Sequence, residues 1–116
     1  MARRRTAVNV VVLAGLALAR EKGLEIIPPR IETGAYWLDV REKEEIAATP
    51  LPFADGRITN IPLNDLRFRL EEIPRGRRIN IICRRGPRAY QAATILRQAG
   101  YRDVAILGGG TQALID

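Results

Sequence analysis

The chain of 116 residues contains no histidine, a single cysteine and few aromatic side chains, which make up 5% of its residues. Histidine is the usual general base of enzymes that activate a serine hydroxyl. Its absence therefore favours cysteine chemistry, in which a thiolate attacks without a base. One cysteine excludes an internal disulfide, a resolving thiol and a zinc site built from cysteines. The apolar share of 47% is typical of a globular protein, and the length suits one domain with a modest core.

The sequence has a shortage of negative charge, and its net charge of +6 comes mostly from arginine. Nucleic-acid-binding domains gather basic side chains in a stripe and place aromatic rings for base stacking. Here the basic residues are scattered and the aromatic residues are few. We therefore expect no nucleic-acid partner and a general attraction for small anions.

Long hydrophobic runs are also lacking, since the apolar stretch at residues 8–19 is too short to cross a bilayer as a helix. Residues 3–5 are arginines, and the stretch ends in small residues at the spacing of a cleavage site, which is typical of a secretory signal peptide. The alternative is a helix capped by Asn9, ended by Gly23 and packed against the domain or a neighbour. Both interpretations of residues 1–24 stay open. We expect a cytoplasmic protein, with export as the alternative.

The one cysteine lies between a predicted strand and a predicted helix. Residues 79–82 form a short apolar run interrupted only by Asn80, as in a buried strand of a parallel sheet. Pro87 suits the first position of a helix, and Gly100 suits its end. Between them, apolar side chains recur at helical spacing, namely Ala89, Ala92, Ala93 and Leu96. Cys83 therefore follows the carboxyl end of a strand, where open α/β sheets place their ligand crevices.

This position favours an anion at Cys83. Backbone N–H groups of the loop and of the first helical turn converge there, and the helix dipole adds partial positive charge. Arg84, Arg85 and Arg88 add three full charges within the same few residues. Each effect stabilises a thiolate over a thiol, so we expect a nucleophile that attacks a negatively charged electrophile. The alternative is a small buried cysteine that ends a core strand beside solvated arginines. The strand–cysteine–arginine–helix context favours the nucleophile.

The loop resembles the active-site loop of the rhodanese family, whose single-domain sulfurtransferases carry the pattern Cys-x-x-Gly-x-Arg. Cys83, Gly86 and Arg88 match this pattern position for position. Phosphatase-like relatives of the family have one more residue between the cysteine and the arginine, and their longer loop cradles a phosphate or arsenate oxyanion. Four residues separate Cys83 from Arg88 here, which is the sulfurtransferase spacing.

Two further stretches resemble family signatures and occur in the family's order. One is Asp39-Val40-Arg41-Glu42 followed by Glu45, and the other is Asn60-Ile61-Pro62-Leu63. Asp39 and Arg41 would end a strand at the sheet edge that carries Cys83. There Asp39 would accept hydrogen bonds that fix neighbouring loops, and Arg41 would be paired or line the crevice. The alternative is a solvated charge cluster that starts a helix. Residues 54–59 depart from the family pattern in a loop that borders the active site in relatives, which leaves acceptor preference and activity open.

The remaining elements follow from local patterns. Apolar runs predict an edge strand at residues 25–30, a core strand at 35–40, a short strand at 58–61 and a last strand at 104–107. A helical stripe consists of Leu63, Leu66, Leu70 and Ile73 and ends at Pro74. The three glycines at 108–110 resemble the family's terminal Gly-Gly turn, whose backbone passes close to the cysteine loop. A tight turn that opens a short helix explains them equally well.

The resemblance covers residues 25–116 and implies an α/β, rhodanese-like three-layer fold with a mainly parallel sheet and helices on both faces. It implies a thiosulfate sulfurtransferase in which Cys83 is catalytic and carries a persulfide. The residues expected to bind substrate are those of the loop, namely Arg84, Arg85, Gly86, Pro87 and Arg88, with Asp39 and Arg41 in support. The expected partners are a small anionic sulfur donor and an acceptor, which is a thiol, either a small molecule or on a protein, or cyanide. No metal or organic cofactor is implied, and we expect a monomer or weak homodimer.

A second hypothesis is a non-catalytic or regulatory binding module, such as an accessory domain of a redox enzyme. Flavin-dependent disulfide reductases of the coenzyme A type often carry a rhodanese domain after their last helix, and residues 1–24 resemble that junction. The basic charge and the altered loop before Asn60 favour this alternative.

Overall fold

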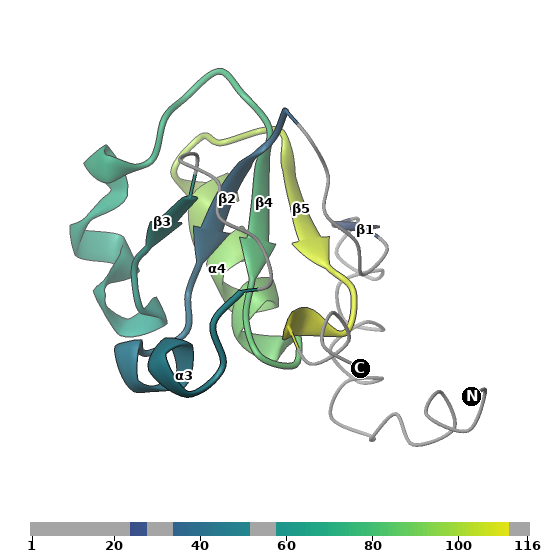
Figure 1. The fold of residues 1–116 in the computed structure, drawn as a ribbon. Helices are drawn as coiled ribbons and strands as arrows, with labels where there is room; N and C mark the ends of the chain where they lie inside the picture. The colour runs from purple at the N-terminus through teal and green to yellow at the C-terminus, as the bar shows by residue number, and fades with distance from the viewer. Residues whose placement is uncertain (1–23, 28–33, 52–57, 112–116) are drawn as a thin grey trace.

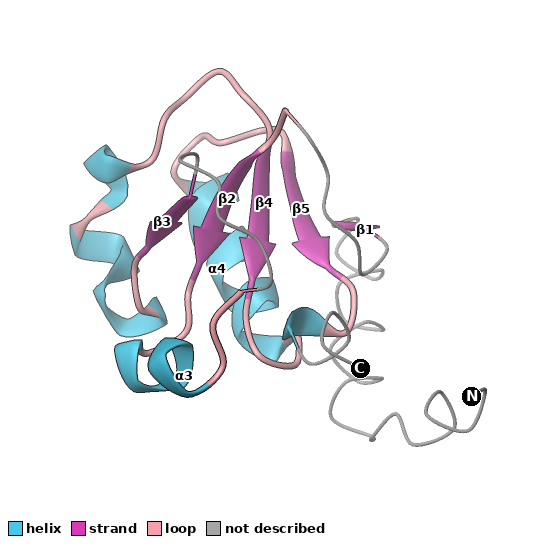
Figure 2. Cartoon of the chain, viewed as in Figure 1, coloured by secondary structure: helices cyan, strands magenta, loops and turns pink. Residues whose placement is uncertain are grey.

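The computed structural model describes residues 24–27, 34–51 and 58–111, and in them the chain forms a five-stranded parallel sheet (Figure 1). From β2 onward, strands alternate with helical segments along the described chain (Figure 2). The strands are β1 (Glu25–Ile27), β2 (Tyr36–Asp39), β3 (Ile58–Asn60), β4 (Ile79–Ile82) and β5 (Val104–Leu107). Each lies within a stretch that the sequence predicts as a strand, and the predicted α/β fold class is confirmed.

The strand order β1-β5-β4-β2-β3 places β2 beside β4, although β3 lies between them in the sequence. The chain leaves β2 toward one edge of the sheet, to β3, and leaves β4 toward the other edge, to β5. Asp39 at the end of β2 is the register partner of Ile82 at the end of β4. The loops that follow these two strands therefore flank a topological switch point, where parallel sheets form their binding crevices.

Helix α4 (Pro87–Gln98) covers one face of the sheet and packs against β4, β5 and η1 (Figure 1). Its buried side chains are Ala89, Ala92, Ala93, Ile95 and Leu96, which include all four residues of the predicted stripe. Each leucine or isoleucine that is fully buried in this way contributes about 1.5–3 kcal/mol to stability. The opposite face buries a second cluster around Trp37, Ile82 and Leu107, against which Leu51 and Ile58 pack.

The helical stripe from Leu63 to Ile73 predicts one helix, but the structure does not have a single continuous helix there. The chain instead forms two 3-10 helices, η1 (Leu63–Phe68) and η2 (Leu70–Glu72), which are separated at Arg69 by a φ of −132°. The hydroxyl of Tyr101 lies 3.1 Å from the carbonyl oxygen of Leu70 and 2.7 Å from that of Ile73. These bonds satisfy carbonyls at the end of the segment, which an α-helix that stops at Ile73 would leave without intrahelical partners, and Pro74 ends the segment.

Helix α3 (Lys43–Ala48) follows β2 and buries none of its side chains. Its first turn is closed by a capping box in which Glu42 and Glu45 each bond the other's backbone N–H. None of the helices within the described residues has the length and apolar character that a membrane-spanning segment needs. Residues 1–23 of the predicted N-terminal segment (1–24) and residues 54–57 of the loop that departs from the family pattern (54–59) lie outside the described residues. The proposed domain boundary at residue 24 stays a prediction.

Candidate active site

Cys83 directly follows β4 and has 1% of its surface exposed. Its Sγ has a polar neighbour, because the backbone N–H of Gly86 donates a hydrogen bond to it over 2.7 Å. The sulfur also faces the first turn of α4, whose dipole favours negative charge at this end. A backbone amide donor and a helix N-terminus are the surroundings in which reactive cysteines occur in proteins.

Gly86 gives the loop the shape that directs this amide. Its φ of 122° and ψ of −41° lie in a region that side chains with a Cβ rarely adopt. Pro87 then begins α4, where its fixed φ suits the helix and its missing N–H costs nothing. The predicted position of Pro87 at the start of the helix is confirmed.

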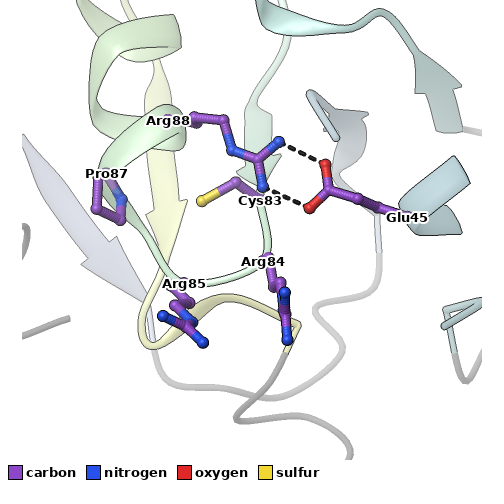
Figure 3. A pocket seen from close by; sticks show the side chains of 6 residues that line it. All are labelled: Glu45, Cys83, Arg84, Arg85, Pro87 and Arg88. Atoms are coloured by element: carbon purple, nitrogen blue, oxygen red, sulfur yellow. Dashed lines mark hydrogen bonds and ion pairs between the residues drawn. The ribbon is translucent and has the colours of Figure 1, made fainter. Parts of the chain in front are cut away.

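The sulfur lies in the wall of an open pocket of about 270 Å³ (Figure 3). The residues that line it are Glu45, Cys83, Arg84, Arg85, Pro87 and Arg88. Four of the five residues predicted to bind substrate therefore line the pocket, and the fifth, Gly86, supplies the amide described above. Their function as substrate-binding residues stays a prediction.

Arg88 is paired with Glu45 across the pocket wall, and Figure 3 shows the two groups facing each other. Nη1 of Arg88 donates to Oε1 of Glu45 over 2.6 Å, and Nη2 donates to Oε2 over 2.7 Å. These bonds lower the pKa of Glu45 to about 2, from an ordinary value of 4.5. The same hydrogen bonding raises the pKa of Arg88. The guanidinium predicted to meet a donor thus already binds a carboxylate with both outer nitrogens.

Sequence reasoning did not assign Glu45 to the site. The carboxylate also accepts the backbone N–H of Glu42 over 2.9 Å. A helix does start here, but the alternative of a solvated charge cluster is wrong for Asp39 and Arg41, which are buried. The one signal of Glu45 in the sequence was its place in the first family signature. Pairing with a residue 43 positions away depends on the fold and leaves no local pattern.

Asp39 and Arg41 form a buried ion pair behind the pocket and lie outside the six described residues that line it. Nε of Arg41 lies 3.0 Å from Oδ1 of Asp39, and Nη2 lies 2.9 Å from Oδ2. The free end of the guanidinium, Nη1, donates to the carbonyl of Thr49 over 2.7 Å, just after α3. Of the two alternatives for Arg41, pairing is correct. The pair fixes both ends of the segment that carries Glu45.

Asn60 completes this support from β3. Its Nδ2 donates to the carbonyl of Asp39 over 2.9 Å and to that of Arg41 over 3.0 Å. The second signature therefore binds the backbone of the first, which was not predicted. A single side chain thereby holds the turn that leaves β2.

The turn after β5 approaches the cysteine loop closely, as the resemblance implies. Gly110 has a φ of 67°, and a Cβ placed there would lie 2.4 Å from the carbonyl oxygen of Arg84. The same turn opens a short helical segment at residues 110–111, so both interpretations of the glycines are correct.

The position of a cysteine at the switch point of a parallel sheet, in a loop that leads into a helix, places the chain in a class of α/β domain. Residues 29–116 match the rhodanese-like domain family, and the chain belongs to it.

Known relatives agree with this assignment. A sulfurtransferase from Allochromatium vinosum is 40% identical over 73 residues, which cover 63% of this chain and 64% of the relative. The structure of an NAD-dependent persulfide reductase from A. fulgidus has a TM-score of 0.72 and 35% identity, covering 87% of this chain and 18% of the reductase. The structure of Bacillus anthracis CoADR-RHD has a TM-score of 0.74 and 32% identity, and the match covers 93% of this chain and 20% of CoADR-RHD. The chain thus spans less than two thirds of the relative from Allochromatium vinosum and about a fifth of the two solved proteins.

Proposed function

We propose that the chain is a sulfurtransferase that moves a sulfane sulfur from thiosulfate or a persulfide donor to an acceptor through a persulfide on Cys83. The observation that carries the proposal is the Gly86 N–H bonded to Sγ of Cys83 in a pocket lined by arginines. An amide aimed at sulfur and basic side chains beside it favour both a thiolate nucleophile and an anionic donor.

In the first half-reaction, the thiolate of Cys83 attacks the outer sulfur of the donor. A new S–S bond forms on Cys83, the S–S bond of the donor breaks, and its electron pair leaves with sulfite or with a thiolate. The resulting persulfide is an anion like the thiolate it replaces, so the Gly86 amide suits it too. Arg84 and Arg85 extend away from the Arg88–Glu45 pair and are the side chains we assign to binding the donor (Figure 3).

In the second half-reaction, an acceptor thiolate or cyanide attacks the outer sulfur of the Cys83 persulfide. The S–S bond on Cys83 breaks, the acceptor leaves as a persulfide or as thiocyanate, and the thiolate of Cys83 is restored. This double displacement needs no cofactor and no general base. The names of the relatives, a sulfurtransferase and a persulfide reductase, support a persulfide on one side of the reaction.

The test is turnover of thiosulfate and cyanide to sulfite and thiocyanate by the wild-type protein and by Cys83→Ser. We expect turnover by the wild type and none by the variant, with equal circular dichroism spectra because serine differs from cysteine by one atom. Turnover that survives in Cys83→Ser would refute the assignment.

A second candidate function is that of an accessory domain of a redox enzyme. The observation that favours it is the similarity to two solved structures, a persulfide reductase and CoADR-RHD, of which this chain covers about a fifth. A folded wild-type protein that lacks turnover with every sulfane donor would favour this non-catalytic function.

A further inference from the structure

The carboxylate of Glu45 lines the pocket that we assign to anionic donors, where a negative charge is unexpected. Of the six described residues that line the pocket, Glu45 is the only acidic side chain, and it lies beside the nucleophile. Its pKa of about 2 keeps it charged at neutral pH. A fixed negative charge at this place repels any anionic donor. The repulsion is stronger for a dianion than for a monoanion.

The geometry of the pair adds a second effect. Both outer nitrogens of Arg88 donate to Glu45, at 2.6 and 2.7 Å, so a donor must compete with a carboxylate for this guanidinium. The two side chains are about one third exposed or less, and the pair is therefore only partly screened by water. Glu45 is also fixed from its own helix, through the N–H of Glu42, so it does not simply turn away.

The charges of the lining residues show which donors fit best. The formal charges of the six lining residues, which are three arginines, one carboxylate and the proposed thiolate beside an uncharged proline, sum to one positive charge. A persulfide anion neutralises this excess, whereas the thiosulfate dianion reverses it. Conversion of Glu45 to a neutral residue would raise the net charge of the pocket lining by one, and it would also release the guanidinium of Arg88 to bind the donor.

We propose that Glu45 is a specificity-determining residue that disfavours dianionic donors such as thiosulfate and selects persulfides of small thiols. The inference rests on the proposed sulfur transfer and names its donor class. Glu45 touches no reacting atom in this scheme. It acts through its charge and through its hold on Arg88, while the bonds formed and broken at sulfur are those given above.

The experiment compares the rates at which thiosulfate and cysteine persulfide load sulfur onto Cys83, measured by intact-protein mass spectrometry. Glu45→Gln should raise the ratio of the thiosulfate rate to the persulfide rate about tenfold, because a dianion interacts with the removed charge about twice as strongly as a monoanion. Glu45→Asp keeps the charge and should keep the wild-type ratio. Glu44→Gln removes the same charge from an exposed position on the same turn of α3 and should leave the ratio unchanged.

A second measurement does not depend on sulfur transfer. The rate of alkylation of Cys83 by anionic iodoacetate is divided by the rate for neutral iodoacetamide, and Glu45→Gln should raise this quotient severalfold. A variant that slows or speeds both donors equally, with an unchanged alkylation quotient, would show that Glu45 only positions Arg88 and would overturn the inference. Wild-type protein that neither donor loads would refute the proposed sulfur transfer and with it the donor class, whereas the alkylation quotient would still test the charge effect.

Discussion

Thr111 donates its backbone N–H to the carbonyl oxygen of Cys83 over 2.8 Å, and so the turn after β5 is bonded directly to the cysteine loop. The two segments are 28 residues apart, and the bond leaves no local pattern in the sequence. It means that the backbone at Gly110 and Thr111 helps to determine where the carbonyl of Cys83, and therefore its side chain, is held.

This contact predicts a severe effect of Gly110→Ala. The Cβ would lie 2.4 Å from the carbonyl oxygen of Arg84, so the turn or the cysteine loop must move. We expect a loss of at least about 3 kcal/mol in the free energy of unfolding, from backbone strain and overpacking together. Urea denaturation measures it. Gly34→Ala is the control, because its φ of 83° is similar but no atom lies within 4 Å of the added Cβ, so strain alone should cost about 1 kcal/mol. Equal losses in the two variants would contradict the close approach.

Gly86→Ala should impair sulfur loading without preventing folding. An added Cβ meets no atom within 4 Å, so the cost comes only from the φ of 122°, and it is about 1–3 kcal/mol. Relief of that strain turns the Gly86 N–H away from Cys83, and we expect the loading rate to fall about tenfold or more. Gly76→Ala, with a φ of 75° in the loop before β4, should leave the rate unchanged. A wild-type rate in Gly86→Ala would remove the amide from the mechanism.

The ion pair of Asp39 and Arg41 predicts a contrast between buried and exposed pairs. Asp39→Asn leaves the charge of Arg41 uncompensated at 1% exposure, which should cost about 3–5 kcal/mol in the free energy of unfolding. Asp103→Asn removes a partner of Arg78 from a pair in which the aspartate side chain is 60% exposed, and should cost less than about 1 kcal/mol. Urea denaturation compares the two. Similar small losses would mean that the buried pair does not hold the segment around α3.

The pKa of Glu45 predicts how stability depends on pH. Because pairing with Arg88 lowers this pKa from 4.5 to about 2 in the folded protein, the pair stabilises the fold fully only above the unfolded value. Its contribution should fall as the pH drops from about 4.5 toward 2. The difference in unfolding free energy between the wild type and Glu45→Gln should therefore shrink over that interval. Urea denaturation at several pH values measures this difference, and a difference that stays constant with pH would contradict the ion pair.

Much of the fold could be predicted from local sequence because its elements carry strong local patterns. The run at residues 79–82 and the alanine-rich stripe after Pro87 specify β4 and α4, and Cys83 lies between them as predicted. The spacing of Cys83, Gly86 and Arg88 also indicated the correct family. These features depend on neighbours a few residues apart, which sequence reasoning can evaluate.

The rest depends on contacts between distant segments. The leucine stripe from Leu63 fits a continuous helix and two 3-10 helices equally well, and the end of this segment is bonded by the hydroxyl of Tyr101, 28 residues beyond Ile73. Likewise, the residues next to Arg88 in the sequence do not reveal whether its guanidinium binds a donor or a carboxylate. Only the placement of α3 beside the cysteine loop brings Glu45 to it.

Mass spectrometry of the intact protein tests the central claim, a Cys83 persulfide as the sulfur carrier, most directly. The wild-type protein is treated with thiosulfate and, separately, with cysteine persulfide, and then with cyanide. We predict a gain of one sulfur atom on Cys83, faster with cysteine persulfide, that cyanide removes with release of an equal amount of thiocyanate. Cys83→Ser should gain no sulfur. A folded wild-type protein that gains no sulfur from either donor, or a Cys83→Ser variant that gains it, would contradict the account.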